Sequence, residues 1–253
     1  MSLVITEIRV LSFNIHKGFS AGNLSFTLRQ IRDAVRSVDA DLVFLQEVLG
    51  EHVTHSQNIK DWPTVSQFEY LADTIWHHHA YGKNAVYEDG HHGNAILSKY
   101  PIVEWWNENI SAHRYENRGL LHIVTEVPGW KAPLHAICLH LGLTNGARQV
   151  QLKKICSRVK GTVPDGCGLL IAGDFNDWNL SASSLLEKEI GVHEVCVKAT
   201  GRHVKTFPSA LPLLSLDRIY AKGFDVKEAR VLTSQRWRRL SDHAPVYGVL
   251  SIV

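Results

Sequence analysis

Three apolar, strand-like runs in this chain end on polar residues that packing does not explain. They are Phe13-Asn14, Leu45-Gln46-Glu47 and the run that closes with Gly173-Asp174-Phe175-Asn176. Functional side chains in sheet proteins tend to sit where a rigid strand gives way to a loop. Carboxylate and amide oxygens are hard ligands that suit Mg²⁺ or Mn²⁺. The pattern predicts a shared rim, although each residue alone is equally compatible with a cap or an Asx-turn.

A second group of ionisable residues lies near the C-terminus, in Ser241-Asp242-His243. Histidine, with a pKa of about 6.5, transfers protons near neutral pH, and a neighbouring carboxylate fixes its tautomer. Asp217 lies inside a strand-like run, where an unpaired carboxylate is costly. We expect Asp217 to orient His243, unless it pairs with Arg218 or another basic residue.

The elements that position these residues begin with a β-α-β unit. Residues 8–15 and 41–48 are apolar and strand-like, and residues 26–38 carry apolar side chains at helical spacing. Further helices are expected at about 65–76 and 147–159, with the histidines 77–79 in a polar loop. Strands are expected at 95–98, 102–106, 120–127, 134–141, 168–172, 216–221, 226–232 and 244–253. Without a linker-like stretch, this order indicates one α/β domain over residues 1–253.

Composition limits the class of protein. Apolar residues make up 45% of the chain and charged residues 21%, which excludes disorder as the default state. No apolar run approaches the roughly 20 residues that a bilayer crossing needs, and residues 1–9 show no secretory signal pattern. The four cysteines lack a C-x-x-C spacing, so we expect reduced thiols and a cytoplasmic location. We also expect a monomer. A net charge of +2 provides no broad basic stripe for nucleic acid.

Taken in order, the motifs resemble the endonuclease/exonuclease/phosphatase superfamily, which includes DNase I, abasic-site endonucleases, neutral sphingomyelinases, deadenylases and inositol-polyphosphate phosphatases. The matching strings are LSFNIHKG (11–18), DLVFLQEV (41–48), GNAILSKYPI (93–102), LHLGL (139–143), LLIAGDFND (169–177), SLDRIYA (215–221) and LSDHAPV (240–246). Single motifs such as GDFN occur by chance, whereas the ordered set is specific. The resemblance implies a four-layer α/β sandwich: two mixed, mostly antiparallel sheets packed face to face, with helices outside.

The resemblance also implies a Mg²⁺- or Mn²⁺-dependent phosphate-ester hydrolase. The implied metal ligands are Asn14, Glu47 and Asp242, the catalytic residues His140, Asp174, Asn176, Asp217 and His243, and the substrate-binding residues His92, Asn94, Arg118 and Arg148. Asp174 would position or activate the attacking water, and Asn176 would hold that water or the phosphate. His140 would donate to a phosphate oxygen. His243, paired with Asp217, would act as the acid–base or phosphate-stabilising group.

Two features bear on the substrate. The abasic-site enzymes carry an acidic residue and a tyrosine where this chain has His16 and His140, so the chain departs from that branch. For Arg118 a surface ion pair, and for Arg148 a solvated first helical turn, are the alternatives to phosphate contact. We expect a phosphodiesterase or nuclease that uses metal-assisted in-line attack by water. The alternative is a phospholipid, phosphoinositide or sugar-phosphate esterase, and a catalytically inactive binding module is the third hypothesis.

Overall fold

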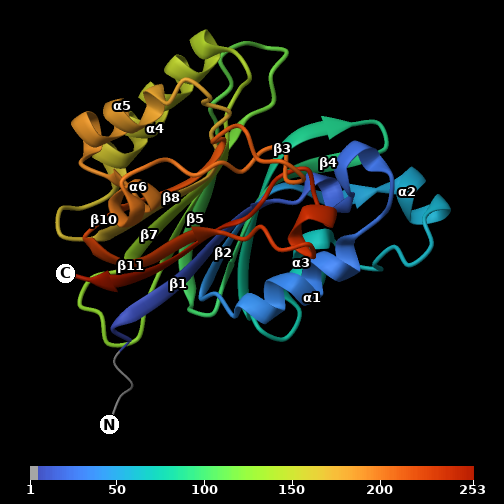
Figure 1. Ribbon diagram of the computed structural model, residues 1–253, viewed down its shortest axis with the longest axis horizontal. Helices are drawn as coiled ribbons and strands as arrows, with labels where there is room; N and C mark the ends of the chain where they lie inside the picture. Colours follow the sequence, from blue (N-terminus) through green and yellow to red (C-terminus); the bar gives the residue numbers. More distant parts are fainter. Residues whose placement is uncertain (1–4) are drawn as a thin grey trace.

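The strands form two six-stranded sheets in the computed structural model, which describes residues 5–253 and leaves residues 1–4 of the expected domain outside the description. The first sheet has the order β11 (Phe224–Val231), β12 (Val246–Ile252), β1 (Glu7–Asn14), β2 (Leu42–His52), β4 (Gly90–Ser98) and β3 (His78–Tyr87). The second has the order β5 (Ile102–Asn109), β6 (Gly119–Thr125), β7 (Leu134–His140), β8 (Gly168–Asp174), β10 (Asp217–Lys222) and β9 (His193–Glu194). The sheets pack face to face (Figure 1).

Each sheet is built around one parallel pair. In the first sheet β1 runs parallel to β2, and in the second β7 runs parallel to β8. The remaining neighbours are antiparallel. A parallel pair needs a long crossover, here supplied by α1 (Leu28–Val38) and α4 (Asn145–Thr162). The expected β-α-β unit and the two mixed, mostly antiparallel sheets are confirmed.

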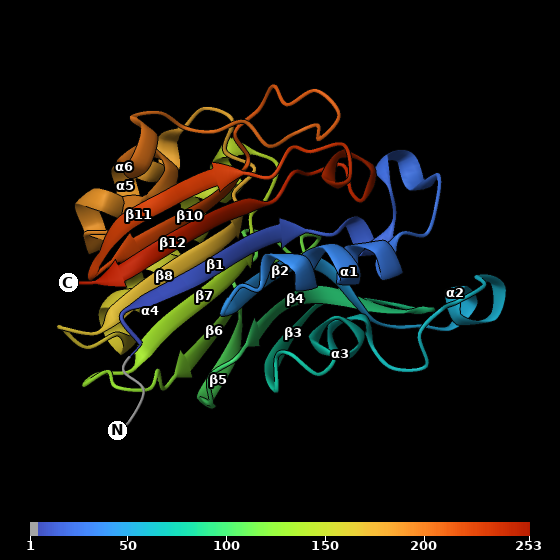
Figure 2. The same cartoon turned by 60° about the horizontal axis from the view of Figure 1, so that its bottom comes forward.

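Helices cover the outer faces of both sheets (Figures 1 and 2). One layer holds α1 and α3 (Gln67–Ala72), and the opposite layer holds α4 and α5 (Ser181–Ile190). The other helices are α2 (Val53–Asn58), α6 (Val195–Thr200) and the short 3-10 helices His16–Gly18, Ala21–Asn23 and Trp237–Arg239. The chain therefore forms four layers, as the resemblance implied.

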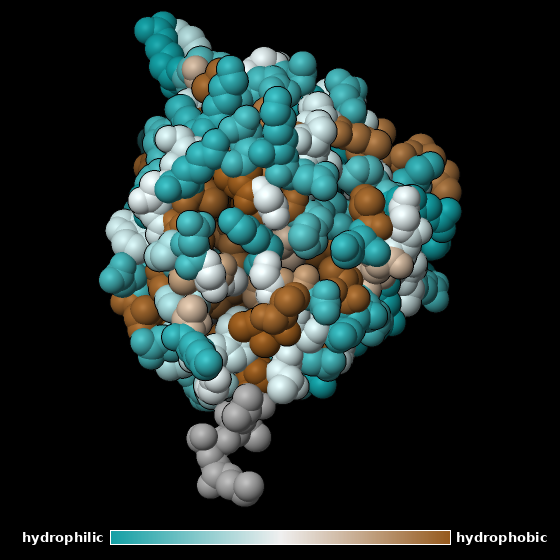
Figure 3. All heavy atoms as spheres, turned by 90° about the vertical axis from the view of Figure 1, so that its left-hand side faces the viewer, coloured by the Kyte–Doolittle hydropathy of each residue, from teal (hydrophilic) through white to brown (hydrophobic). Residues whose placement is uncertain are grey.

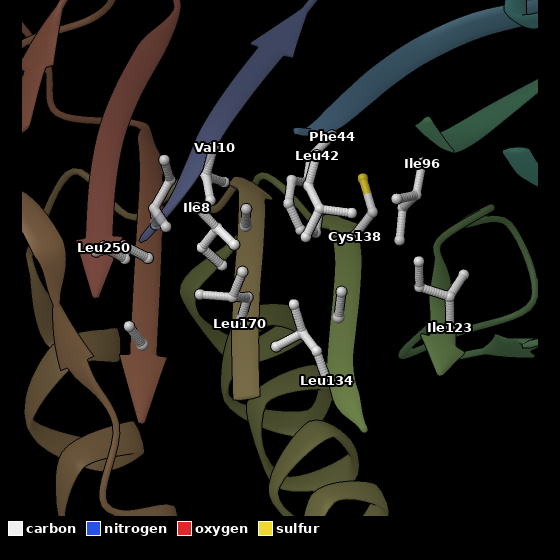
Figure 4. Packing of buried hydrophobic residues seen from close by; sticks show 14 of the residues in the cluster. Ile8, Val10, Leu42, Phe44, Ile96, Ile123, Leu134, Cys138, Leu170 and Leu250 are labelled. Atoms are coloured by element: carbon white, nitrogen blue, oxygen red, sulfur yellow. The ribbon is translucent and has the colours of Figure 1, made fainter. Parts of the chain in front are cut away.

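Alternation along the strands divides the apolar side chains among three cores. In β2, Leu42 and Phe44 face the second sheet, whereas Val43 and Leu45 face α1 and α3. The inner core joins residues of both sheets, including Ile8, Ile96, Leu134 and Leu170 (Figure 4). Because side chains in a strand alternate between faces, every second residue of a central strand lies between the sheets. This parity also determines where the polar strand ends point.

The expected helix at 65–76 is shorter in the structure, and the expected loop at 77–79 holds for His77 but is wrong for His78 and His79. Ser66 caps α3 with a capping box to Glu69, and Asp73, with φ 46°, ends the helix after Ala72. His78 and His79 then begin β3, where the ring of His79 packs 5.4 Å from Phe68. Pairing with β4 outweighs the polar composition of this segment.

Two expectations from composition also hold in the structure. The four cysteines are free. Among residues 5–253, no helix combines the length and apolar character needed to cross a bilayer.

Candidate active site

The polar strand ends meet between the two sheets. Asn14, His140, Asp174 and Asp217 each continue the series of alternate residues that forms the inner core. In the second sheet Asp174 is the register partner of both His140 and Asp217. Because these positions follow the apolar inward-facing residues at the same end of their strands, their side chains converge at one end of the sandwich. The expected shared rim is present.

Glu47 reaches the same place through a local irregularity of β2. By strict alternation Glu47 would face the helical layer, on the side of Leu45. Its φ is 54°, and the register of β2 against β4 shifts between Leu45 and Val48. A bulge of this kind bends a strand and redirects a side chain, and left-handed backbone at a non-glycine residue is costly. The bulge places the Glu47 carboxylate within hydrogen-bonding distance of Asn14.

Asn14 connects the two sheets. Its Nδ2 donates to Glu47 Oε1 at 3.2 Å and to Asp174 Oδ2 at 3.2 Å, and its Oδ1 accepts from the backbone N–H of His16 at 3.0 Å. The acceptor role of Oδ1 fixes which end of the amide faces the carboxylates. Asn14 thus holds the carboxylates of two sheets together. Direct metal ligation by its oxygen remains a prediction that would require the amide to turn.

Asp174 lies at the centre of the pocket. Its Oδ2 is 3.4 Å from His140 Nε2 and 3.7 Å from His243 Nε2. Burial, together with the nearby charge of Asp217, raises the pKa of Asp174 to about 6, although His243 opposes the shift. Burial and the positive charge of Arg118 hold the pKa of His140 well below its usual value, so His140 is neutral near pH 7.

His243 and Asp217 form the expected pair, with Nδ1 2.8 Å from Asp217 Oδ2. Burial alone would lower the pKa of His243, but the carboxylates of Asp217 and Asp174 outweigh it and raise the pKa to about 10. The Thr206 hydroxyl accepts from the backbone N–H of Asp217 at 3.1 Å, which fixes the start of β10. His243 is therefore a cationic donor whose Nε2 faces Asp174.

Asn176 lies beside Asp174 after a sharp turn of the chain. Its backbone N–H donates to Asp174 Oδ1 at 2.9 Å, and its Nδ2 donates to the carbonyl of Leu141 at 3.0 Å. Its φ is 47°. Just before it, a Cβ on Gly173 would lie 1.9 Å from the carbonyl oxygen of Leu139, so only glycine fits. These contacts hold the turn that presents both polar side chains.

Sequence reasoning overlooked a partner of Asp242. His16 Nδ1 lies 2.8 Å from Asp242 Oδ1, and this contact raises the pKa of His16. Burial alone would raise the pKa of Asp242, but the hydrogen bond from His16 lowers it. The signal was available, since His16 follows Asn14 by two residues in the first motif. Lys17 was also missed, and its charge acts on both His140 and His92.

Two expected substrate-binding residues adjoin the pocket, and a third, Asn94, is buried between the sheets. His92 and Arg118 line a hollow of about 360 Å³ beside the site. Neither His92 Nδ1 nor Arg118 Nε has a hydrogen-bond partner among residues 5–253, although both atoms are buried. Burial and the charge of Lys17 lower the pKa of His92 to about 4. Asn94 is buried and donates to the carbonyls of Gly119 and Cys138, which ties the two sheets together.

Arg148 is not placed for substrate contact, contrary to expectation. Its side chain is fully buried, its guanidinium donates to the Leu143 carbonyl at 2.6 Å, and Nε lies 3.9 Å from Asp177 Oδ1. The guanidinium also packs over the Trp178 ring at 4.4 Å. The reason is that α4 turns this side of its first turn toward the loop after β8. Arg148 therefore stabilises the loops that surround the site.

Comparison with known proteins agrees with this geometry. The family model described as "Endonuclease/Exonuclease/phosphatase family" matches residues 11–243. The chain belongs to the endonuclease/exonuclease/phosphatase family. Its relatives include the uncharacterized protein YbhP of Escherichia coli (strain K12), which is 47% identical over 240 residues, covering 95% of this chain and 94% of YbhP.

Solved structures of the same fold superpose on nearly the whole chain. An endonuclease/exonuclease/phosphatase from Bacteroides vulgatus has a TM-score of 0.77 at 17% identity, covering 98% of this chain and all (100%) of that one. The mannosyl-6-phosphatase Bt3783 of Bacteroides thetaiotaomicron has a TM-score of 0.72 at 18% identity, covering 97% and 100%. At these identities the likeness establishes the fold alone.

The pocket has the donors that a divalent cation of this family needs. Glu47 and Asp242 are partly exposed carboxylates whose charges both act on His16. Asp174, Asp217 and His243 also approach one another within 4.8 Å. That second trio is a poorer metal site, because His243 and Asp217 already bond to each other. The carboxylates of Glu47 and Asp242 offer oxygen ligands, which would suit Mg²⁺ or Mn²⁺ better than a site containing imidazole.

Proposed function

We propose that this protein is a Mg²⁺- or Mn²⁺-dependent hydrolase of phosphate esters, and that its preferred substrates are diesters, with nucleic acid first among them. One observation supports this proposal above the others. A single buried oxygen, Asp174 Oδ2, lies 3.4 Å from one imidazole nitrogen, 3.7 Å from another and 3.2 Å from the amide that binds Glu47. In-line attack at phosphorus needs a base for water and donors for the phosphate oxygens, close to a cation site.

Asp174 is the group suited to accept the proton of the attacking water. Its pKa of about 6 makes it a stronger base than an exposed aspartate while it stays ionised at pH 7. The backbone N–H of Asn176 occupies Oδ1, so Oδ2 is the oxygen that faces the reacting groups. Asn14 donates to the same Oδ2 and fixes its direction. Asn176, next to Asp174, would then limit the positions that the attacking water can take.

Two imidazoles supply donors of different charge. Neutral His140 donates an N–H, and protonated His243, held by Asp217, donates from Nε2 to a phosphate or leaving-group oxygen. A Mg²⁺ or Mn²⁺ ion held by Glu47 and Asp242 would neutralise charge that develops on the phosphate. The buried carboxylates repel a dianionic monoester more strongly than a monoanionic diester, which supports diester cleavage.

A second candidate is favoured by a separate observation. Loops at the mouth of the site carry exposed apolar side chains: Leu143, Trp178, Leu180, Leu211 and Leu213. Such exposure around a polar pocket also suits the acyl chains of a phospholipid, so a sphingomyelinase-like or phosphoinositide phosphoesterase is the alternative. Because a mannosyl-6-phosphatase has the same fold, we include a sugar phosphate as a third substrate to test.

The test is a substrate and metal panel. Purified protein is incubated with Mg²⁺, Mn²⁺, Ca²⁺ or EDTA and with plasmid DNA, single-stranded DNA, RNA, bis-p-nitrophenyl phosphate, p-nitrophenyl phosphate, mannose 6-phosphate, sphingomyelin or phosphoinositides. We expect Mg²⁺- or Mn²⁺-dependent, EDTA-sensitive release from diesters. Activity that persists in the His243→Ala protein is contamination. No hydrolysis of any ester with either metal contradicts the proposal, and faster cleavage of lipid than of nucleic acid favours the alternative.

A further inference from the structure

A basic groove lies beside the site, between the segment 200–205 that follows α6 and the end of β11. It has a volume of about 560 Å³, and its lining includes Arg202, His203, Lys205 and Arg230 but no acidic residue. A second hollow of about 470 Å³ shares Arg230, Val231 and Thr233 with it as one wall. On the face seen in Figure 3, which carries α6 and β11, hydrophilic side chains surround patches of apolar atoms.

Two further arginines extend the positive charge along the second hollow. Arg238 Nε donates to the carbonyl of Thr233 at 2.9 Å, and Thr233 lines both hollows. Arg236 donates to the Ser37 hydroxyl at 3.3 Å on the opposite wall. Together with Arg202, His203, Lys205 and Arg230, they make up what we call the basic flank. Its members come from segments 200–205, 230 and 236–238, which are separated in the sequence and brought together by the fold.

Most of this charge is free to meet a ligand. Arg202 and Lys205 are exposed, and neither forms an ion pair with any described residue. Arg230 is balanced by Glu228 at 2.8 Å, and burial lowers the pKa of His203, so the free charge belongs to the other members. Unpaired cations held along a concave surface attract phosphates that follow one another at regular spacing.

Both walls of the groove lead to the catalytic pair. Lys205 precedes Thr206, whose hydroxyl accepts from Asp217 N–H and whose carbonyl accepts from Ala244 N–H. On the other wall, the Leu232 N–H donates to the carbonyl of Pro245, two residues from His243. A chain leaving the pocket on this side therefore meets the basic flank.

We infer that the basic flank binds the phosphates of a nucleic-acid strand whose scissile phosphate lies at Asp174 and His243. This inference rests on the proposed function only for the position of the scissile phosphate at Asp174 and His243. A flexible strand fits consecutive hollows, whereas a flat bilayer does not enter them. In addition, none of the large apolar side chains exposed between residues 5 and 253 belongs to 200–205 or 229–239, so this flank lacks what lipid insertion needs.

The test reverses charge at two exposed positions in the Arg202→Glu/Lys205→Glu protein. Binding of a fluorescent 30-nucleotide single strand, in Ca²⁺ or EDTA over a series of salt concentrations, is compared with binding by the wild type. We expect about tenfold weaker affinity, and a salt slope smaller by about 1.4, which is about 0.7 for each phosphate that the variant no longer neutralises. Hydrolysis of bis-p-nitrophenyl phosphate, which is too small to reach the flank, stays at the wild-type rate. The matched control is Lys131→Glu/Lys188→Glu, with the same change in net charge at exposed positions outside the flank.

Unchanged oligonucleotide affinity, or an equal decrease in the control, overturns the inference. So does a decrease in binding to phosphatidylserine vesicles that is larger than the decrease for the oligonucleotide. Binding is measured without turnover. A protein that hydrolyses nothing yet shows the expected weakening of binding would contradict the proposed function and leave the basic flank intact.

Discussion

At the scale of single residues, Asp174 is a buried carboxylate that the proposed chemistry needs in its ionised form. A buried carboxylate is costly unless hydrogen bonds and counter-charge stabilise it. Here Asn14 and the Asn176 N–H bond to its oxygens, and the imidazole of His243 lies 3.7 Å away. Asp217 holds the other face of that imidazole. The contacts that offset the cost of burying Asp174 also set the pKa values of Asp174 and His243.

We therefore expect His243→Ala and Asp174→Asn each to lower turnover of bis-p-nitrophenyl phosphate by about 100-fold or more, since each removes a proton-transfer group. The measurement is initial rate at saturating Mg²⁺, with far-ultraviolet circular dichroism as the check on folding. His77→Ala is the control, because His77 is exposed in the loop before β3 and does not line the hollow of His92 and Arg118. Near-normal turnover in either site variant would rule out its assigned role.

Glu47 should determine how much metal the enzyme needs. Glu47→Gln keeps the size of the side chain and removes its charge, so the Mg²⁺ concentration for half-maximal activity should rise by at least about tenfold. The exposed Glu51→Gln, four residues further along β2, is the control. A metal requirement that is unchanged in Glu47→Gln would move the cation site elsewhere, for example to Asp174, Asp217 and His243.

At the scale of elements, buried polar contacts hold the strand ends in place behind the reacting groups. The Arg218 guanidinium, next to Asp217 in β10, donates to Asp177 Oδ2 at 2.9 Å, and both side chains are buried. Asp177 also accepts from the N–H of Ala182 at 2.8 Å, in the first turn of α5. One carboxylate thus joins the loop after β8, the strand β10 and a helix.

Removing that carboxylate should destabilise the protein strongly. Asp177→Ala leaves the buried Arg218 charge without its partner, which typically costs about 3–5 kcal/mol in the free energy of unfolding. Urea denaturation at pH 7 measures the loss. Glu189→Ala, which removes the exposed partner of Lys160, is the control and should leave stability near the wild-type value. Equal effects of the two substitutions would show that the buried pair does not stabilise the fold.

A second buried network lies at β6 and gives stability a dependence on pH. His122 is fully buried, 3.0 Å from His135 and 3.3 Å from Arg158. Burial, with the charges of His135 and Arg158, lowers the pKa of His122 to about 3. Below a pH of about 6.5 the unfolded chain binds a proton at His122 that the folded protein does not bind, so stability falls as pH decreases.

Between pH 7 and pH 5 this group alone should reduce the free energy of unfolding by about 2 kcal/mol. The His122→Gln protein, which cannot titrate there, should lose correspondingly less over the same interval. Urea denaturation of both proteins at the two pH values tests the difference. If the two proteins show the same loss, His122 is not the source of the pH dependence.

At the scale of the whole molecule, the proposed catalytic groups come from both sheets, and so do the residues of the inner core. Ile8 and Ile96 of the first sheet pack in one cluster with Leu134 and Leu170 of the second (Figure 4). Asn14 and Asp174 bond across the same interface at 3.2 Å. Neither sheet can bury its inner face without the other, so the site and the core depend on the same packing.

We expect residues 5–253 to unfold as one cooperative unit for this reason. Urea transitions followed by tryptophan fluorescence and by far-ultraviolet circular dichroism should coincide, with one midpoint for both signals. Trp76 reports on the first sheet and its helices, while Trp178 lies beside the second. Two separated transitions would show that the sheets fold as independent domains.

The sequence by itself determined the elements and the polar groups at their ends. Alternation along the strands and helical spacing along 26–38 are local patterns, and local patterns are visible in a single sequence. The ordered motifs indicated the family, because seven matching strings in one order are far more specific than a single string. The coarse α/β architecture and the convergence of Asn14, Glu47 and Asp174 followed from these two sources.

Only the tertiary structure decided which partner each polar group takes. Glu47 reaches the pocket through a bulge that strict alternation does not predict, and His16 pairs with Asp242 across more than 200 residues. Arg148 is turned inward by the packing of α4, and the basic flank is assembled from three distant segments. Partner choice depends on burial and on distances through space, which spacing along the chain does not encode.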